Sequence, residues 1–505
     1  MTEPCDLTAL EARRLIGAKK LSATELLESC LGRIAKVNPA VNAMTAMDEG
    51  AARATARAAD EKTMKGEALP LLHGLPVGIK DLEETKGLRT TWGSPIFADH
   101  VPDKDEHMVA NLREQGGVVI GKTNVPEFGL GANSRNLVWG ATGNAFNPEF
   151  NAAGSSGGSA VALATNMVPL ASGSDTGGSL RNPAAFNGIV GYRPSSGLVP
   201  GSRRAHGWSP LPMIGPMARD MNDLALMLSA MASDAAVDPL SYTFHGRKMR
   251  EVPEYYHPVA PADLSSLKLA FTEDFGQAPT ESIVRRAFRK VVAALAPMFA
   301  RAEETHPDVA GADECFEVLR STGVLTSHLE KVTNRPQDCG PNLHANVKEA
   351  LGYTFADQSN ALLRQTQIYR GFQTFFAGHD ILVSPAICTS PRPWLELYPA
   401  VIDGKPVRTY FHWLSLAYYV TITGHPALSL PVGVDEKGFP FGLQIVGPRG
   451  GDVLLLQVAA AIEAAFAGDA EFARPVPDLA ALEKAPPMSS RPGFKTWEQV
   501  PYTQA

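Results

Sequence analysis

Residues 153–183 read AGSSGGSAVALATNMVPLASGSDTGGSLRNP, in which two Ser/Gly-rich strings flank an apolar run. Glycines beside a serine leave its hydroxyl unobstructed and let backbone N–H groups approach a substrate oxygen closely. The two strings therefore predict two loops that present Ser155 and Ser179 in one pocket. A flexible linker is the alternative for such a composition. The apolar run, Asp175 and Arg181 are not typical of linkers, and they favour the pocket.

Segments with strand-like and helix-like patterns alternate on both sides of this stretch. Ser22 and Glu25 form a capping box that opens a helix, and an Ala-rich helix is expected at about 47–65. Buried strands are predicted at residues 76–82, 117–123, 267–271, 381–386, 427–433 and 442–447. The alternation predicts an α/β fold, a single large α/β/α domain whose central mixed β-sheet is covered by helices on both faces.

The chain of 505 residues is long enough for two to four domains, but the continuous alternation favours one large unit with insertions. We expect this domain to span residues 1–473, with its core at about 70–220. A largely helical insertion is expected at about 303–378, either lining a binding cleft or forming a plain helical cap. The Pro-rich residues 474–505 are expected to be a loosely attached C-terminal tail.

Composition and charge exclude several classes of partner. The formal net charge of −7 provides no general basic field for nucleic acid or an anionic membrane. The sequence contains no apolar run of membrane-spanning length and starts without a secretory signal pattern. Five scattered cysteines without CxxC spacing predict a reducing, cytoplasmic compartment. The histidines are dispersed too, so we expect neither a metal site nor a cofactor.

Residues 116–123, GGVVIGKT, match the GxxxxGK[ST] pattern of a phosphate-binding loop. That loop requires its variable residues to curve into a nest of N–H groups. Here the variable residues are Gly-Val-Val-Ile, which predict a strand, and Pro126 soon follows. We interpret the match as accidental.

A serine attacks a carbonyl only when a base accepts its proton, and histidine is the usual base. The sequence has no GxSxG elbow, and no histidine stands out. Lys80, in the apolar string PVGIK, is the best-placed alternative. At an ordinary pKa near 10.4 only roughly one lysine in 2,500 is neutral at pH 7, but burial lowers that pKa and raises the neutral share. A solvated surface charge is the other interpretation of a lone lysine.

Further blocks follow one another in the order LPVGIKDL at 75–82, GGVVIGKTNVPEFG at 116–129, GPMARD at 215–220 and TGHPALSLPVG at 423–433. Together with the Ser/Gly stretch they resemble the amidase signature hydrolases over roughly residues 21–465, least so in the middle. The separations of 75 residues from Lys80 to Ser155 and 24 from Ser155 to Ser179 also match members of that family.

The resemblance implies a Ser-Ser-Lys triad. Ser179 would be the nucleophile that forms an acyl-enzyme, Ser155, preceded by a cis peptide bond, would relay the proton, and Lys80 would be the base. The N–H groups expected to form the oxyanion hole are those of Thr176, Gly177, Gly178 and Ser179. The residues expected to support the loops are Ser156, Asp175 and Arg181. Ala153 stands where the family usually has glycine, which affects the loop rather than the triad.

The implied function is that of an amidohydrolase that cleaves a carboxylic amide C–N bond and releases ammonia or an amine, with carbamates and esters as further candidate substrates. The alternatives are the glutaminase (A) subunit of a tRNA-dependent amidotransferase and a catalytically silent binding protein on the same fold. A small-molecule amide is the expected partner, and a homodimer is a candidate assembly. The residues that would line an apolar or aromatic acyl pocket, unless they serve core packing, are Trp92, Phe128, Leu130, Trp139 and Trp208.

Overall fold

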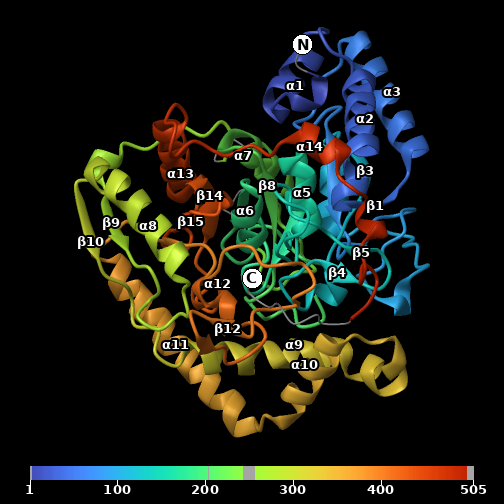
Figure 1. Cartoon of the computed structure of the whole chain (residues 1–505). Coiled ribbons are helices and arrows are strands. Elements are labelled where there is room, and N and C mark those ends of the chain that lie inside the picture. The colour runs from blue at the N-terminus through green and yellow to red at the C-terminus, as the bar shows by residue number, and fades with distance from the viewer. Residues whose placement is uncertain (1–2, 203, 243–255, 498–505) are drawn as a thin grey trace.

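An eleven-stranded sheet runs through the centre of the protein (Figure 1). The structure is a computed structural model that describes residues 3–202, 204–242 and 256–497. Across the sheet the strands are, in order, β1 (Met44–Met47), β3 (Val118–Thr123), β2 (Pro76–Lys80), β6 (Leu170–Asp175), β8 (Met213–Ala218), β7 (Val190–Arg193), β14 (Ala427–Val434), β15 (Pro440–Val446), β11 (Ile381–Pro385), β9 (Lys268–Phe271) and β10 (Arg301–Glu304). The short strands of two small separate sheets are β4 (Arg135–Asn136), β5 (Gly140–Ala141), β12 (Val401–Ile402) and β13 (Lys405–Pro406).

The large sheet is mixed, as the sequence predicted. Strands β3, β2 and β6 are parallel neighbours, and β11, β9 and β10 form a second parallel group. Between these groups the pairs from β6 to β11 are all antiparallel. Each parallel group lies near one end of the sheet. Parallel neighbours cannot be joined by a tight hairpin, so helical crossover connections link the strands within each group.

Helices surround this sheet (Figure 1). Their bounds are α1 (Ala9–Gly17), α2 (Ala23–Val41), α3 (Glu49–Lys65), α4 (His107–Glu114), α5 (Gly157–Ala164), α6 (Arg181–Asn187), α7 (Met221–Met231), α8 (Ser282–Leu295), α9 (Ala312–Asn334), α10 (Pro341–Gly352), α11 (Phe355–Phe376), α12 (Ser415–Thr421), α13 (Asp452–Phe466) and α14 (Leu479–Lys484). The expected capping box is present at the start of α2, where Ser22 and Glu25 bond each other's backbone N–H. Helix α3 ends at Gly66, whose φ of 70° lies in the left-handed region that favours glycine.

The inner strands of the sheet are buried on both faces, which explains near-continuous apolar strings such as ILVSP in β11. Along β11, Ile381 and Val383 join the core that contains α8 and α13. Leu382 between them points the other way and joins the core that contains α9, α11 and α12. Because successive strand residues face opposite sides, helices cover both faces, and the predicted fold class is confirmed.

The sheet brings the Ser/Gly loops and Lys80 together. Strand β2 runs parallel to β6, with Val77 opposite Leu170, so their carboxyl ends meet at one edge. Lys80 is the last residue of β2, and Asp175 is the last of β6. Helix α5 begins at Gly157, directly after Ser155 and Ser156, and α6 begins shortly after Ser179.

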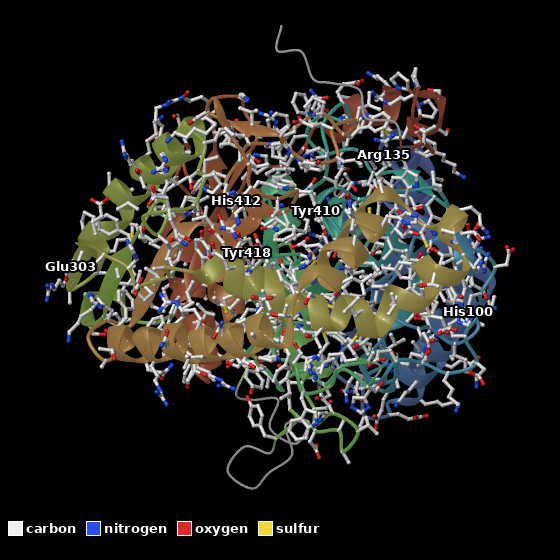
Figure 2. The ribbon with its side chains drawn as sticks, turned by 90° about the horizontal axis from the view of Figure 1, so that it is seen from below. His100, Arg135, Glu303, Tyr410, His412 and Tyr418 are labelled. Carbon is white, nitrogen blue, oxygen red and sulfur yellow. The ribbon has the colours of Figure 1, made fainter. Side chains whose placement is uncertain are left out.

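The segment expected to be a helical insertion contains α9, α10 and α11. These helices cross the molecule on the side seen from below in Figure 2. Helix α9 is tied to α12 by Asp313, which accepts hydrogen bonds from the Tyr418 hydroxyl at 2.6 Å and the Tyr419 hydroxyl at 3.0 Å. This segment is therefore fixed to α12.

The expectation of a loosely attached tail is wrong for residues 474–497. Helix α14 packs on α2, and Leu482 and Met488 are buried. Phe494 lies against Gly140, and the Arg474 guanidinium donates to the Gly188 carbonyl at 3.1 Å. Apolar residues between the prolines hold the segment to the core, and residues 498–505 lie outside the described part.

No helix in the described ranges combines the length and the apolar content that crossing a membrane requires.

Candidate active site

Ser179 lies in the loop between β6 and α6, and this loop is built around a buried ion pair. The Asp175 carboxylate accepts from Arg181 Nη2 at 2.9 Å, from the Gly178 N–H at 2.8 Å and from the Leu180 N–H at 3.1 Å. Burial alone would raise the pKa of Asp175, but the guanidinium groups of Arg181 and Arg193 hold it well below its usual range. The carboxylate therefore stays charged and fixes the loop from within.

Ser155 and Ser156 precede α5. The peptide bond between Gly154 and Ser155 is cis, as the family resemblance implied. The Ser156 N–H donates to the Ser179 carbonyl at 3.3 Å, and its hydroxyl donates to the Ser174 carbonyl at 3.4 Å. Ser156 thus connects the two Ser/Gly loops, in line with a supporting role.

Lys80 reaches the same place from β2. Its Nζ donates to Ser155 Oγ at 2.8 Å, to Ser174 Oγ at 2.9 Å and to the Ser174 carbonyl at 3.2 Å. The side chain is fully buried, so the interpretation as a solvated surface charge is excluded. Burial lowers the pKa of Lys80 to about 7, against the opposing effect of the Glu83 and Asp175 carboxylates. A large neutral fraction at pH 7 follows, and a neutral amine is a competent base.

Ser155 and Ser179 line one cavity of about 330 Å³. Among the hydrogen bonds of the described residues none joins their hydroxyls. Ser155 Oγ accepts from Lys80 Nζ, which leaves the Ser155 O–H free to donate. Serine side chains change partners by rotation about χ1, and catalytic hydrogen bonds often tighten only once substrate is bound. The geometry thus brings Lys80 and Ser155 into contact and places Ser179 on the same cavity wall.

The N–H groups expected to form an oxyanion hole differ in availability. The Gly178 N–H is used by Asp175, so the expectation for this residue is wrong. Among the described residues the N–H groups of Thr176, Gly177 and Ser179 donate to no protein acceptor. A φ of 107° at Gly178, which favours glycine, turns the backbone at this point. Three donors therefore remain for a substrate oxygen.

Only part of the expected aromatic pocket lines the cavity. Phe128 and Leu130 contribute to its wall, whereas Trp92 lines a neighbouring cavity. Trp139 instead donates from Nε1 to Thr91 Oγ1 at 2.9 Å, because the indole N–H finds its partner in the core. Trp208 is 74% exposed and lies outside the cavity lining. The pocket prediction is therefore wrong for Trp139 and Trp208.

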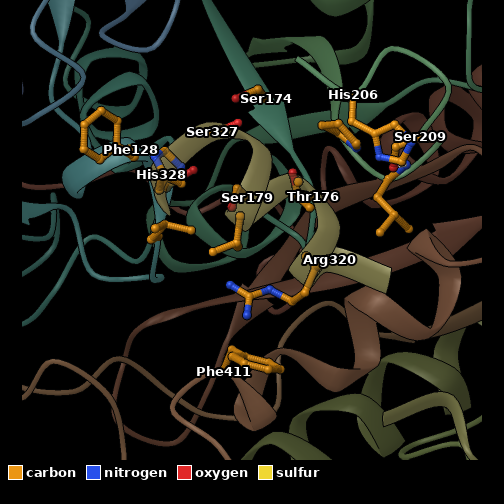
Figure 3. Close-up of a pocket in the computed structure, with 18 of the residues that line it drawn as sticks. Phe128, Ser174, Thr176, Ser179, His206, Ser209, Arg320, Ser327, His328 and Phe411 are labelled. Carbon is orange, nitrogen blue, oxygen red and sulfur yellow. Dashed lines mark hydrogen bonds between the residues drawn. The ribbon is translucent and has the colours of Figure 1, made fainter. Parts of the chain in front are cut away.

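The sequence predicted a helical segment at about 303–378 that lines a cleft or forms a cap, but it did not identify the α9 side chains that face the cavity. One face of α9 lines it, at the spacing of three and four residues typical of a helix: Phe316, Leu319, Arg320, Gly323, Val324, Ser327 and His328. Figure 3 shows Arg320 and His328 near Ser179, together with Phe411 from the segment before α12. The helical spacing was visible in the sequence, but the side of α9 that meets Ser179 depends on how α9 packs.

Residues 116–123 match the pattern of a phosphate-binding loop, but most of them form a strand, as expected. Strand β3 covers Val118–Thr123. Lys122 is fully buried and donates to Thr85 Oγ1 at 2.9 Å and to the Glu83 carbonyl. It binds the protein itself rather than facing a ligand. Within the described residues no group of three His, Cys, Asp or Glu side chains is arranged to hold a metal ion.

The chain is similar to known proteins over most of its length. A family model described as Amidase matches residues 25–456. The chain is 33% identical to the A subunit of the glutamyl-tRNA(Gln) amidotransferase of Acidothermus cellulolyticus, over 91% of this chain and 94% of that protein. It is 31% identical to an acylamidase of Rhodococcus erythropolis, over 91% and 95%. The crystal structure of a bacterial aryl acylamidase of the amidase signature family superposes with a TM-score of 0.85 at 25% identity, covering 96% of this chain and 99% of that one.

Proposed function

The chain belongs to the Amidase family and hydrolyses amides, and from this premise we propose that it does so through an acyl-enzyme on Ser179. The proposal rests on one observation above all. The fully buried Lys80 amine, whose pKa is lowered, lies 2.8 Å from Ser155 Oγ, and Ser155 shares a cavity wall with Ser179. Serine activation needs a base, and this amine is placed to act as one.

In the proposed acylation, Ser179 Oγ attacks the amide carbonyl carbon. Its proton passes to Ser155 Oγ, while the Ser155 proton passes to neutral Lys80 Nζ. The N–H groups of Thr176, Gly177 and Ser179 stabilise the negative oxygen, at roughly 3–4 kcal/mol for each well-aimed donor. Return of the proton along the same path to the leaving nitrogen releases ammonia or an amine and leaves the acyl group as an ester on Ser179.

In the proposed deacylation, water attacks the ester carbonyl and gives its proton to Ser155, which again passes one to Lys80. The tetrahedral intermediate collapses, the proton returns to Ser179 Oγ, and the carboxylic acid product leaves. The pathway uses this chain's own side chains and backbone N–H groups, together with water. Carbamates and esters carry the same carbonyl geometry and are included as candidate substrates.

Fluorophosphonate labelling tests the nucleophile. We expect one adduct, located by mass spectrometry on the peptide that contains Ser179 and absent from Ser179→Ala. Hydrolysis of aliphatic amides, anilides, carbamates and esters is then measured with Ser179→Ala as the blank. An adduct on another residue, or undiminished hydrolysis by Ser179→Ala, contradicts the proposal. Absence of any labelling favours the silent binding protein.

A second candidate function is that of the glutaminase component of a tRNA-dependent amidotransferase, which the 33% identity to such a component favours. The cavity wall argues for the first function, because Phe128, Phe316 and Leu414 suit an apolar or aromatic substrate group. Purification from the native host separates the two. Copurifying partner proteins, with glutamine as the best substrate, would support the amidotransferase.

A cytoplasmic location is proposed on the five free cysteines, of which Cys5, Cys30, Cys315 and Cys388 are buried. A homodimer stays a prediction, which sedimentation velocity of the purified protein tests directly.

A further inference from the structure

The Arg320 side chain extends from α9 into the cavity that holds Ser179 (Figure 3). Its Nη2 donates to the Tyr410 hydroxyl at 3.1 Å, and its Cζ lies 4.5 Å from the centroid of the Phe411 ring. These two contacts hold the guanidinium in place. A guanidinium has five N–H donors, so most of them are left for a ligand in the cavity.

Within the described residues Arg320 forms no ion pair, and its acidic neighbours are already engaged. Glu317 pairs with Arg408 at 3.1 Å, and Glu349 accepts from the Tyr353 hydroxyl at 2.9 Å. The cavity's own wall, as described, supplies no carboxylate to Arg320.

Two other basic side chains of the cavity, Arg204 and His328, do not provide a comparable charge. Arg204 is paired with Asp238 at 2.5 Å. Burial, with the nearby charges of Lys331 and Arg320, lowers the pKa of His328 to about 3, so its ring is neutral at pH 7. Its Nδ1 is buried and has no hydrogen-bond partner among the described residues. Arg320 thus gives a largely apolar cavity a positive charge that no protein carboxylate neutralises.

We propose that Arg320 binds a carboxylate carried by the amide substrate, and that the enzyme prefers amides with such an anionic group. This inference rests on the proposed function and names its substrate class. A guanidinium binds a carboxylate through two parallel N–H···O bonds. Apart from the N–H that Nη2 gives to Tyr410, the Arg320 guanidinium donors have no protein acceptor among the described residues. The carboxylate belongs either to the acyl part or to the amine part of the substrate.

Matched substrate pairs test the inference. Glutaryl-4-nitroanilide against pentanoyl-4-nitroanilide places the carboxylate on the acyl part. N-acetyl-4-aminobenzoate against N-(4-methylphenyl)acetamide places it on the amine part. The quantity compared is the ratio of kcat/KM for the anionic member to kcat/KM for the neutral member.

In one of the two pairs we expect Arg320→Gln to lower this ratio about 10- to 100-fold. Arg320→Lys keeps the charge without the two-pronged geometry and is expected to give an intermediate ratio. Arg370→Gln, on the exposed part of α11, removes the same charge outside the cavity and should leave both ratios at the wild-type value. Ratios for Arg320→Gln within twofold of wild type in both pairs overturn the inference.

Failure of the proposed function gives a different result. If no amide is hydrolysed, or hydrolysis survives in Ser179→Ala, the proposed function fails. Calorimetric binding of N-acetyl-4-aminobenzoate and glutaryl-4-nitroanilide to Ser179→Ala protein still tests Arg320. We expect at least one of these two ligands to bind tenfold or more weakly to the double variant Ser179→Ala/Arg320→Gln than to Ser179→Ala. If each ligand binds equally to the single and the double variant, the inference is overturned. Melting temperatures of all variants confirm that they are folded.

Discussion

Asp175 and Arg181 form an ion pair without solvent exposure on either side chain, with Arg181 Nη2 2.9 Å from Asp175 Oδ1. They stand at the two ends of the loop that carries Ser179. The guanidinium of Arg193 lies 3.5 Å from the same oxygen. The loop therefore depends on one carboxylate that balances two buried positive charges.

Replacing Asp175 with Asn should destabilise the protein strongly. Two buried guanidinium groups would lose their counter-charge, and breaking a buried pair from one side costs about 3–5 kcal/mol. We expect a clear fall in melting temperature, together with a loss of Ser179 labelling at temperatures where the variant is still folded.

An exposed ion pair serves as the control for this measurement. Arg286 and Glu436 are 2.6 Å apart but about half exposed. Solvent weakens such a pair, whose contribution is about 0–1 kcal/mol. Glu436→Gln should therefore leave the melting temperature almost unchanged, and an equal effect of the two substitutions would contradict the role given to Asp175.

Removal of the Lys80 amine should abolish turnover without unfolding the protein. Lys80→Met keeps the apolar stem that fills the buried site but cannot accept a proton. General base catalysis contributes about 10²- to 10⁴-fold, and we expect a loss in kcat/KM of that size. The measurement is kcat/KM beside the circular dichroism spectrum. Near-normal turnover in a folded variant would refute Lys80 as the base.

The pH dependence of kcat/KM should report the titration of Lys80. Burial disfavours the charged amine and lowers the pKa of Lys80 to about 7. Because the neutral amine is the active form, activity should rise with pH through about 7 and then level off. An inflection near the ordinary lysine pKa instead would mean that Lys80 is not the titrating base.

Glu83 gives this profile a second test. Its buried carboxylate favours the charged form of Lys80. Burial also raises the pKa of Glu83 to about 7, so its carboxyl is charged over the upper part of the acid limb and largely protonated below it. Glu83→Gln removes that charge, so the upper part of the limb should move to lower pH. Glu67→Gln removes an equal charge from an exposed position and should leave the limb in place. A shift toward higher pH would contradict the electrostatic account.

Much of the sheet, and the position of Lys80 at its edge, was predictable because the signals for them are local in the sequence. An apolar strand such as β2 (PVGIK) indicates burial on both faces, and the end of β2 places Lys80 at the sheet edge. Some of the contacts that were missed join distant segments, and one is local. The use of the Gly178 N–H by Asp175 depends on the exact turn of the loop.

The cavity wall was the least predictable part. Arg320 and Phe411 come together only because α9 and the segment before α12 pack across the Ser179 loop. Trp208 and Trp139 stand near the catalytic blocks in the sequence, yet one is exposed and the other bonds within the core. Proximity along the chain is thus a weak guide to which side chains meet a substrate.

Gly323 on α9 offers a way to change the size of the substrate pocket. It lines the cavity, and a Cβ added there meets no atom within 4 Å. Gly323→Ala should therefore stabilise α9 by up to about 1 kcal/mol, because alanine favours a helix interior more than glycine does.

Gly323→Phe should fill cavity space and lower kcat/KM for bulky amides about tenfold or more relative to acetamides. Gly32→Phe, at a position on α2 outside the cavity with equally open surroundings, should not change that ratio. An unchanged preference in Gly323→Phe would mean that the substrate does not lie against this face of α9.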